Sequence, residues 1–289
     1  MDKKVLYISD LDGTLLKKDV SLSEFTVKTV NELIGKGMIF SFATARSRYT
    51  SSKLTRELNI SAPVVIYNGT FICDLKSGKK IVSNDFSRAE AKHILDMLLD
   101  KGVFPMVHAF LGESEKYLFN EKNMSRGMAD FQSKREQDER RTPVGVYDLA
   151  PYDVFYFTCI DDEDKLKPLY EELKLSYQCL YTKDIYSGDY WLEILPNKAT
   201  KASAIRELKS ILGCDKVICF GDGTNDIAMF KDADERYAVA NAHPELKKLA
   251  TDVIHSNEDD GVAKWLINNF NSCVDKEPPY PMAICKETS

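Results

Sequence analysis

Short apolar runs alternate with runs of helical periodicity in the first part of the chain. Residues 5–9, 38–43 and 63–67 have the length and composition of buried strands. Between them, apolar side chains recur at helical spacing over 25–34 and over 48–58. Strands that alternate with helices in this way are typical of βαβ units, so the pattern predicts an α/β fold with a Rossmann-like parallel sheet.

The pattern changes after about residue 84, where a periodic stretch predicts a helix and an aromatic run over 154–160 predicts a strand. The βαβ rhythm returns near residue 200. Insertion of one domain into another is the simplest account of such a break. We therefore expect a discontinuous core domain and an inserted α+β domain, with these ranges: core 1–84 and 192–289, inserted domain 85–191.

Composition and charge argue against several classes of binding partner. The chain has 289 residues and a formal net charge of −6, which gives no general attraction to nucleic acid or to an anionic membrane. The apolar run at residues 5–8 is too short for a signal peptide or a membrane span, so a cytoplasmic protein is expected. Seven cysteines, never spaced Cys-x-x-Cys, argue against a disulfide framework and a zinc site. Nothing in the pattern indicates an oligomeric state.

Polar side chains follow the predicted strands at the positions where a parallel sheet binds ligands. Asp10 and Asp12 leave the first strand two residues apart, and Gly13 allows a tight turn there. Asp222 and Asp226 arrive in a later loop that follows the predicted strand 217–220. Four carboxylates in one place require a cation, and Mg²⁺ prefers such hard oxygen ligands. Asp10, Asp12, Asp222 and Asp226 are therefore the candidate metal-binding residues.

The same residues predict phosphoryl transfer. A carboxylate attacks a phosphate ester only when a metal offsets their repulsion, so one residue, Asp10, can be both nucleophile and metal ligand. Thr44 follows the second strand, and Lys201 lies at the start of a predicted helix, where anions bind well. Both would hold phosphoryl oxygens during transfer. Arg46 would contact phosphate or substrate, with a surface salt bridge as an equal alternative.

This set of motifs resembles the haloacid dehalogenase (HAD) superfamily of phosphatases, and within it the Cof-like subfamily IIB with its C2-type cap. The resemblance spans most of the chain and rests on four motifs. They are Asp10-Leu11-Asp12-Gly13-Thr14, Phe42-Ala43-Thr44-Ala45-Arg46, the segment 193–201 that ends in Lys201, and Gly221-Asp222-Gly223-Thr224-Asn225-Asp226. Because Lys198 also precedes the same predicted helix, the choice between Lys198 and Lys201 stays open.

The resemblance implies a role for each residue. Asp10 would become the phosphoaspartate, and Asp12 would protonate the leaving oxygen and then activate water. Mg²⁺ would be held by the Asp10 side chain, the Asp12 carbonyl and Asp222, with Asp226 in the outer shell. Asn225 would contact phosphate. Asn68 and Gly69 would line the pocket beside the leaving group.

The function expected from the sequence is a Mg²⁺-dependent phosphatase that acts on a small phosphorylated metabolite. Sugar phosphates are the leading class, followed by pyridoxal phosphate and nucleotides. Two alternatives stay open: a phosphomutase of the same superfamily, and a non-catalytic phosphosugar-binding sensor. The charged run 121–141 is interpreted as a solvated face, with a substrate-selecting lid as the alternative.

Overall fold

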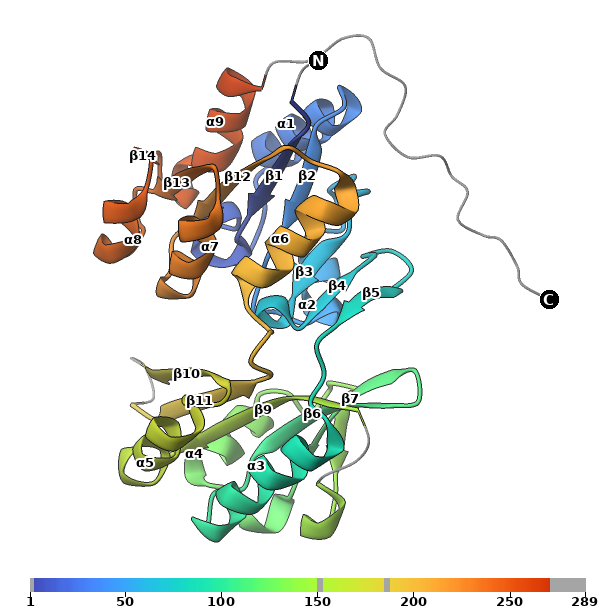
Figure 1. Cartoon of the computed structure of the whole chain (residues 1–289), viewed down its shortest axis with the longest axis vertical. Helices are drawn as coiled ribbons and strands as arrows, with labels where there is room; N and C mark the ends of the chain where they lie inside the picture. The colour runs from blue at the N-terminus through green and yellow to red at the C-terminus, as the bar shows by residue number, and fades with distance from the viewer. Residues whose placement is uncertain (1–2, 150–152, 185–187, 271–289) are drawn as a thin grey trace, which may run out of the picture. The chain divides into compact units, whose positions relative to one another are not determined.

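The computed structural model describes residues 3–149, 153–184 and 188–270, and these divide into two compact units (Figure 1). Unit 1 consists of Met1–Val82 together with Thr200–Ser289, and unit 2 consists of Ser83–Ala199. The chain thus leaves unit 1, completes unit 2 and returns. In the described residues, no helix is long and apolar enough to cross a membrane.

Unit 1 is built on a five-stranded parallel sheet with the strand order β14-β13-β12-β1-β2. The central strand β1 pairs with β2 on one side and, across more than half of the chain, with β12 on the other. The strands are β1 (Val5–Ser9), β2 (Ile39–Phe42), β12 (Lys216–Gly221), β13 (Glu235–Val239) and β14 (Asp252–Ile254).

A second small sheet lies beside β2, because Ala43 forms a parallel bridge with Val65. This sheet has the order β3-β4-β5, and it comprises β3 (Val64–Ile66), β4 (Phe71–Cys73) and β5 (Lys80–Ser83).

Helices with local capping signals connect the strands of unit 1. Ser23 accepts a hydrogen bond from the backbone N–H of Thr26, and Ser47 does the same for Thr50, so each satisfies an otherwise free donor at a helix start. Helix α1 packs against α9, and α7 packs against both α6 and α8. The helices are α1 (Glu24–Gly35), α2 (Arg48–Leu54), α6 (Lys201–Leu212), α7 (Ile227–Asp232), α8 (Pro244–Leu249) and α9 (Gly261–Asn269).

Unit 2 is a six-stranded sheet with the order β10-β11-β9-β6-β7-β8. Its neighbouring strands are antiparallel except for the parallel pair β7 and β8. The strands are β6 (Met106–Leu111), β7 (Ser114–Phe119), β8 (Arg141–Pro143), β9 (Val154–Asp161), β10 (Gln178–Lys183) and β11 (Tyr190–Leu195).

The two faces of this sheet are covered differently. Helices α3 (Arg88–Asp100) and α5 (Glu163–Leu173) bury their leucine and isoleucine side chains against one face, which presents residues such as Val107 and Phe157. Helix α4 (Arg126–Ser133) packs against part of the other face through Met128. The α+β character predicted for the inserted segment is confirmed.

Several elements differ from the sequence expectations. Strand β11 pairs with β9 and β10 inside unit 2, so the structure places the return to unit 1 after Ala199 rather than at residue 192. The run 121–141 is not only a solvated face, because it contains α4 with the buried Met128, and because Arg140 is largely buried between Glu115 and Asp138. Of the seven cysteines, the five in the described residues are free thiols, and Cys273 and Cys285 lie outside those residues.

Candidate active site

The carboxyl ends of β1 and β12 bring Asp10 and Asp222 together. The two strands are parallel neighbours with Ser9 opposite Phe220, so the residues that follow them emerge at the same edge of the sheet. The backbone N–H of Asp10 donates to the Phe220 carbonyl at 2.9 Å and extends this pairing by one residue. The sheet itself therefore fixes the position of the Asp10 carboxylate.

A tight turn at residues 11–15 closes the loop after Asp10. Gly13 has a φ of +73°, and a Cβ atom there would lie 2.4 Å from Asp222 Oδ2. Only glycine allows this backbone conformation together with the close approach of the Asp222 carboxylate. The next residue, Thr14, donates its hydroxyl to Asp222 Oδ1 at 2.9 Å and ties the turn to the later loop.

Lys201 is the buried cation of the site. It is the first residue of α6, whose start is capped by Thr200. Its Nζ donates to Asp10 Oδ1 at 2.5 Å and to Asp226 Oδ1 at 2.7 Å. Lys198, the alternative from the sequence, is exposed to solvent.

Asp226 is buried and orders the loop that carries Asp222. Its Oδ2 accepts the backbone N–H groups of Asp222 and Gly223, both at 3.1 Å. Carboxylate oxygens of Asp10, Asp222 and Asp226 lie within 4.8 Å of one another, a spacing that could hold a metal ion. The structure thus brings together three of the four predicted metal-binding side chains.

Burial sets the electrostatics of this cluster. It raises the pKa of Asp10 to about 8, with Lys201 lowering that pKa and Asp226 raising it. Burial and the charge of Asp226 likewise raise the pKa of Asp222 to about 6. Burial alone would lower the pKa of Lys201, but the attraction of Asp10 and Asp226 holds it above its ordinary value. One ammonium against three carboxylates leaves an excess of negative charge that a bound cation would stabilise.

The Asp12 side chain faces Arg46 instead of the carboxylate cluster. Arg46 donates to Asp12 through Nε at 2.7 Å and through Nη2 at 2.6 Å, which is a bidentate pair. Asp12 is about half exposed, whereas Arg46 is more enclosed. Arg46 therefore holds the Asp12 carboxylate, which is the salt bridge that the sequence left open as an alternative, although the sequence did not indicate Asp12 as its partner.

Thr44 and Asn68 lie next to each other at the end of β2. The Asn68 backbone N–H donates to the Thr44 carbonyl at 2.9 Å, and Thr44 Oγ1 accepts the N–H of Arg46 at 3.1 Å. The side-chain atoms Nδ2 and Oδ1 of Asn68 are buried, and neither has a hydrogen-bond partner among the described residues. Because an unpaired buried amide is costly, this side chain is suited to a ligand or a water molecule.

Gly69 and Asn225 complete the predicted set. A Cβ atom at Gly69 would lie 2.2 Å from the Thr200 carbonyl oxygen, so this glycine lets the loop pass the start of α6. Asn225 is exposed in the turn before α7. Asn241, which no motif indicated, donates to the Gly13 carbonyl at 2.7 Å and supports the turn.

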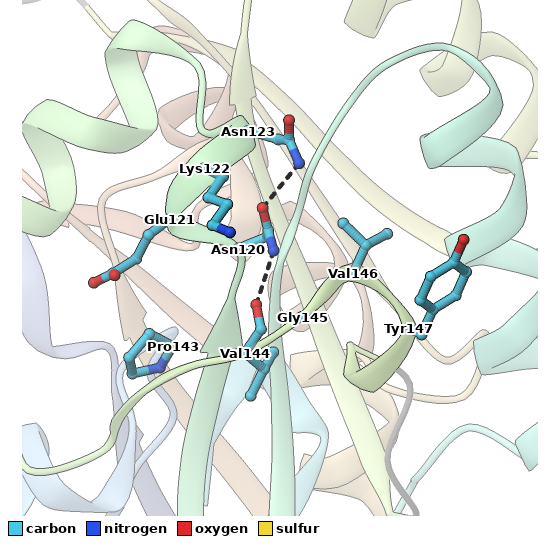
Figure 2. Close-up of a pocket in the computed structure, with 9 residues that line it drawn as sticks. All are labelled: Asn120, Glu121, Lys122, Asn123, Pro143, Val144, Gly145, Val146 and Tyr147. Carbon is cyan, nitrogen blue, oxygen red and sulfur yellow. Dashed lines mark hydrogen bonds between the residues drawn. The ribbon is translucent and has the colours of Figure 1, made fainter.

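A separate hollow of about 480 Å³ lies in unit 2. Figure 2 shows that Asn120 links its two walls, because its amide donates to the Val144 carbonyl at 2.8 Å and accepts from Asn123 at 2.9 Å. These bonds already use the central amide, and none of the lining residues belongs to the carboxylate cluster. The lining residues are Asn120, Glu121, Lys122, Asn123, Pro143, Val144, Gly145, Val146 and Tyr147.

The parallel sheet, the carboxylate cluster at the carboxyl ends of its strands and the inserted second unit define an α/β protein with a candidate metal-dependent site. The chain belongs to the haloacid dehalogenase-like hydrolase family, whose sequence profile matches residues 7–266. It is a Cof-like member of the HAD superfamily. The expected fold class, family and enzyme class, a phosphatase, are thereby confirmed.

Two relatives from Bacillus subtilis align over nearly their whole length. The 5-amino-6-(5-phospho-D-ribitylamino)uracil phosphatase YwtE is 30% identical over 279 residues, which cover 89% of this chain and 95% of the relative. A second phosphatase of the same description, YitU, is 26% identical over 290 residues, which cover 93% of this chain and 98% of the relative.

Solved structures share the fold. A haloacid dehalogenase-like hydrolase from Bacteroides thetaiotaomicron superposes with a TM-score of 0.76 at 22% identity and covers 93% of this chain and 100% of its own. A HAD subclass IIB sugar phosphatase superposes with a TM-score of 0.70 at 18% identity, over 92% of this chain and 98% of its own. At these identities the likeness concerns the fold.

Proposed function

We propose that this chain is a Mg²⁺-dependent phosphatase that hydrolyses small phosphorylated metabolites, sugar phosphates foremost, through a phosphoaspartate on Asp10. The observation that carries the proposal is the buried Asp10 carboxylate, fixed at the end of β1, bonded to Lys201 and close to Asp222 and Asp226. Ligands bind at the carboxyl edge of a parallel sheet, and buried clusters of ion pairs are frequent at functional sites, so this edge is a candidate site for a reaction of a charged substrate.

The carboxylate cluster fits Mg²⁺. Asp10, Asp222 and Asp226 offer hard oxygen donors within 4.8 Å, and Mg²⁺ normally takes few carboxylates and completes its shell with water and substrate phosphate. When bound, the ion would reduce the repulsion between the Asp10 carboxylate and a phosphate dianion. The Asp12 backbone carbonyl is a further candidate ligand, whereas the Asp12 side chain is held by Arg46.

The chemistry runs in two displacements at phosphorus. A carboxylate oxygen of Asp10 attacks and the bond from phosphorus to the ester oxygen breaks, while Asp12, which starts this step protonated, gives its proton to that ester oxygen, so that the product leaves as an alcohol. Asp12 then takes a proton from water, which attacks the phosphoaspartate and releases inorganic phosphate with Asp10 restored. Lys201, Thr44 and the exposed Asn225 hold phosphoryl oxygens in this scheme, and Asn68 and Gly69 line the pocket.

The names of the two relatives bear on the substrate class. Both are described as acting on a phosphoribitylamino compound, which is a phosphate monoester of an open-chain polyol. This supports the sugar and polyol phosphates over nucleotides and pyridoxal phosphate. We also propose that unit 2 acts as a cap domain that determines which ester is hydrolysed, and that the protein works in the cytoplasm.

Phosphate release tests the proposal. We expect Mg²⁺-dependent release from sugar and polyol phosphates by the wild type, and a loss on the order of 10³-fold or more in Asp10→Ala, because the nucleophile is gone. Asp100→Ala, at an exposed position at the end of α3, is the matched control and keeps full activity.

Other outcomes separate the alternatives. No release by the wild type from any ester, p-nitrophenyl phosphate included, would refute the phosphatase and favour a sensor. Conversion of one sugar phosphate isomer into another, with a strict need for a bisphosphate, would identify a phosphomutase instead.

A further inference from the structure

Asn241 joins two loops at the edge of the sheet where the carboxylate cluster lies. It follows β13, and β13 is the parallel neighbour of β12, so Asn241 emerges at the same carboxyl edge as Asp222. Its exposed side chain bonds through both ends of the amide: Nδ2 donates to the Gly13 carbonyl at 2.7 Å, and Oδ1 accepts the backbone N–H of Asn257 at 3.0 Å. A side chain that bonds backbone groups on both sides fixes two loops relative to each other.

Asn257 holds the tight turn of residues 11–15 at a second point. It is buried, and its Nδ2 donates to the carbonyl of Leu16, the residue at which the turn ends, at 2.9 Å. The turn is therefore held from outside at two backbone carbonyls, those of Gly13 and Leu16. Since Asn257 also bonds the Asn241 side chain, the two asparagines form one connected support for the turn.

The backbone of this turn has a defined conformation. Asp12 has a φ of −72° and a ψ of 124°, and Gly13 has a φ of +73° and a ψ of −3°, which are the values of a type II β-turn. Such a turn determines the direction of the Asp12 carbonyl, a candidate metal ligand. The Gly13 carbonyl and the Thr14 N–H belong to one planar peptide group, so the bond from Asn241 fixes the plane from which Thr14 continues.

Thr14 connects the turn to Asp222, a candidate metal ligand. Its hydroxyl donates to Asp222 Oδ1 at 2.9 Å. The loop that carries Asn241 reaches Asp222 by a second route, because the backbone N–H of His243 donates to the Asp222 carbonyl at 2.8 Å. The loop after β13 thus binds both the turn that contains Thr14 and the backbone of Asp222. Its position therefore bears directly on the orientation of this carboxylate.

We propose that Asn241 is a positioning residue of the metal site. It holds the Gly13 carbonyl, and through Thr14 it keeps the Asp222 carboxylate oriented for a divalent cation. Groups that bond a ligand affect metal affinity because they determine how that ligand is oriented. These residues all belong to unit 1. The choice of Mg²⁺ and the kinetic test rest on the proposed function, whereas the binding test does not require that an ester is hydrolysed.

Isothermal titration calorimetry of the ester-free protein with MgCl₂ tests the inference. We expect Asn241→Ala to raise Kd for Mg²⁺ about 5- to 20-fold, because the Asp222 carboxylate loses its fixed orientation. Asn269→Ala is the matched control, since Asn269 is also exposed and donates its Nδ2 to a backbone carbonyl, that of Trp265, at 2.8 Å. We expect this control to bind Mg²⁺ like the wild type. An unchanged Kd in Asn241→Ala would overturn the inference.

Two further measurements separate positioning from folding. Without Mg²⁺, we expect the thermal midpoint of Asn241→Ala to stay within about 4 °C of the wild type, because an exposed neutral hydrogen bond contributes little to stability. With p-nitrophenyl phosphate, the Mg²⁺ concentration for half-maximal rate rises about 5- to 20-fold, while kcat at saturating Mg²⁺ stays within about threefold. A larger fall in the midpoint, or a loss of kcat that added Mg²⁺ does not restore, would contradict a positioning role.

A double-mutant cycle tests the path through Thr14. Thr14→Val removes the hydroxyl that bonds Asp222 and keeps the shape of the side chain, so we expect it to raise Kd for Mg²⁺ about 10-fold. In Thr14→Val protein, Asn241→Ala then changes Kd less than about twofold, since the contact on which it acts is already missing. Independent effects of the two substitutions would refute this path. A wild type that binds Mg²⁺ but hydrolyses no ester would refute the proposed function alone, and a wild type that binds no Mg²⁺ would refute both.

Discussion

At the scale of single residues, the site is a set of paired charges. Lys201 is enclosed by Asp10 and Asp226, and Arg46 is paired with Asp12. The first group, of three residues, is buried, so its members depend on each other, since a buried charge without a partner is strongly unfavourable. The second group, a pair, is partly exposed, so it orders the Asp12 side chain and adds little to the stability of the fold.

Removal of the Lys201 ammonium tests the first group. We expect Lys201→Ala to lower kcat about 10²- to 10³-fold, because the proposed contact of a fixed positive group with the transferred phosphoryl oxygens is lost. It also lowers the thermal midpoint, since Asp10 and Asp226 lose their shared partner. Phosphate release and differential scanning fluorimetry are the measurements. Lys198→Ala is the control, and equal behaviour of the two variants would contradict the assignment.

Substitution of Arg46 tests the second pair. If Arg46 holds Asp12 for proton transfer, Arg46→Ala lowers kcat for alkyl phosphates about 10- to 100-fold. The aryl ester is affected less, because p-nitrophenolate leaves without a proton. Arg46→Lys does not restore the activity, since an ammonium cannot make the bidentate contact. Equal losses on both esters would indicate phosphate binding by Arg46 instead.

At the scale of elements, glycines permit the close approach of loops and helices. Gly69→Ala would place a Cβ atom 2.2 Å from the Thr200 carbonyl oxygen at a φ of +104°. Gly37 has a similar φ of +92° but no atom within 4 Å of the added Cβ. We expect Gly69→Ala to destabilise unit 1 by about 1–3 kcal/mol more than Gly37→Ala, because only the first adds a backbone clash. Urea unfolding followed by Trp265 fluorescence, in Trp191→Phe protein, measures the difference.

The elements that the sequence predicted well are those with strong periodicity or strong capping. Strand β1 and helix α1 match the expectation closely, because an apolar run and the Ser23 cap mark their limits. Strand β10 was not predicted, since its residues are only partly buried and give little alternation. Helix α4 was not predicted either, because it is short and lies within a charged run.

The site residues also divide into those that the sequence predicted and those that it did not. Asp10 could be found because it directly follows a predicted strand, Asp222 and Asp226 because they lie in the segment after another, and Lys201 because it lies at the start of a predicted helix. The contact of Arg46 with Asp12 depends on side-chain direction, which strand order does not determine. Asn241 joins the Gly13 turn from a loop with no motif, so only the folded chain reveals it.

At the scale of the whole molecule, each unit has its own core and its own tryptophan. Trp265 packs against Phe220 and Tyr237 in unit 1, and Trp191 packs against Phe131 in unit 2. The chain has two tryptophans in all, so single substitutions give a separate fluorescence signal for each unit. Stability changes can therefore be assigned to one unit.

Acid is expected to destabilise unit 2 through His108. Its folded pKa of about 3 lies below the ordinary value of 6.5, so the unfolded chain binds the proton more readily. The stability that neutral His108 contributes is complete above about pH 6.5 and is lost progressively as the pH falls toward 3. Urea midpoints from Trp191 fluorescence, in Trp265→Phe protein, should fall more steeply between pH 7 and 5 than in the same protein with His108→Phe. Identical slopes would contradict this assignment.

The position of β1 between β2 and β12 has a consequence for synthesis on the ribosome. One edge of β1 stays unpaired until β12 has been translated, after the whole of unit 2. Unit 2 is continuous in sequence, so it can complete its core while unit 1 is still half made. The nascent chain thus leaves one edge of the apolar strand β1 unpaired for most of its translation.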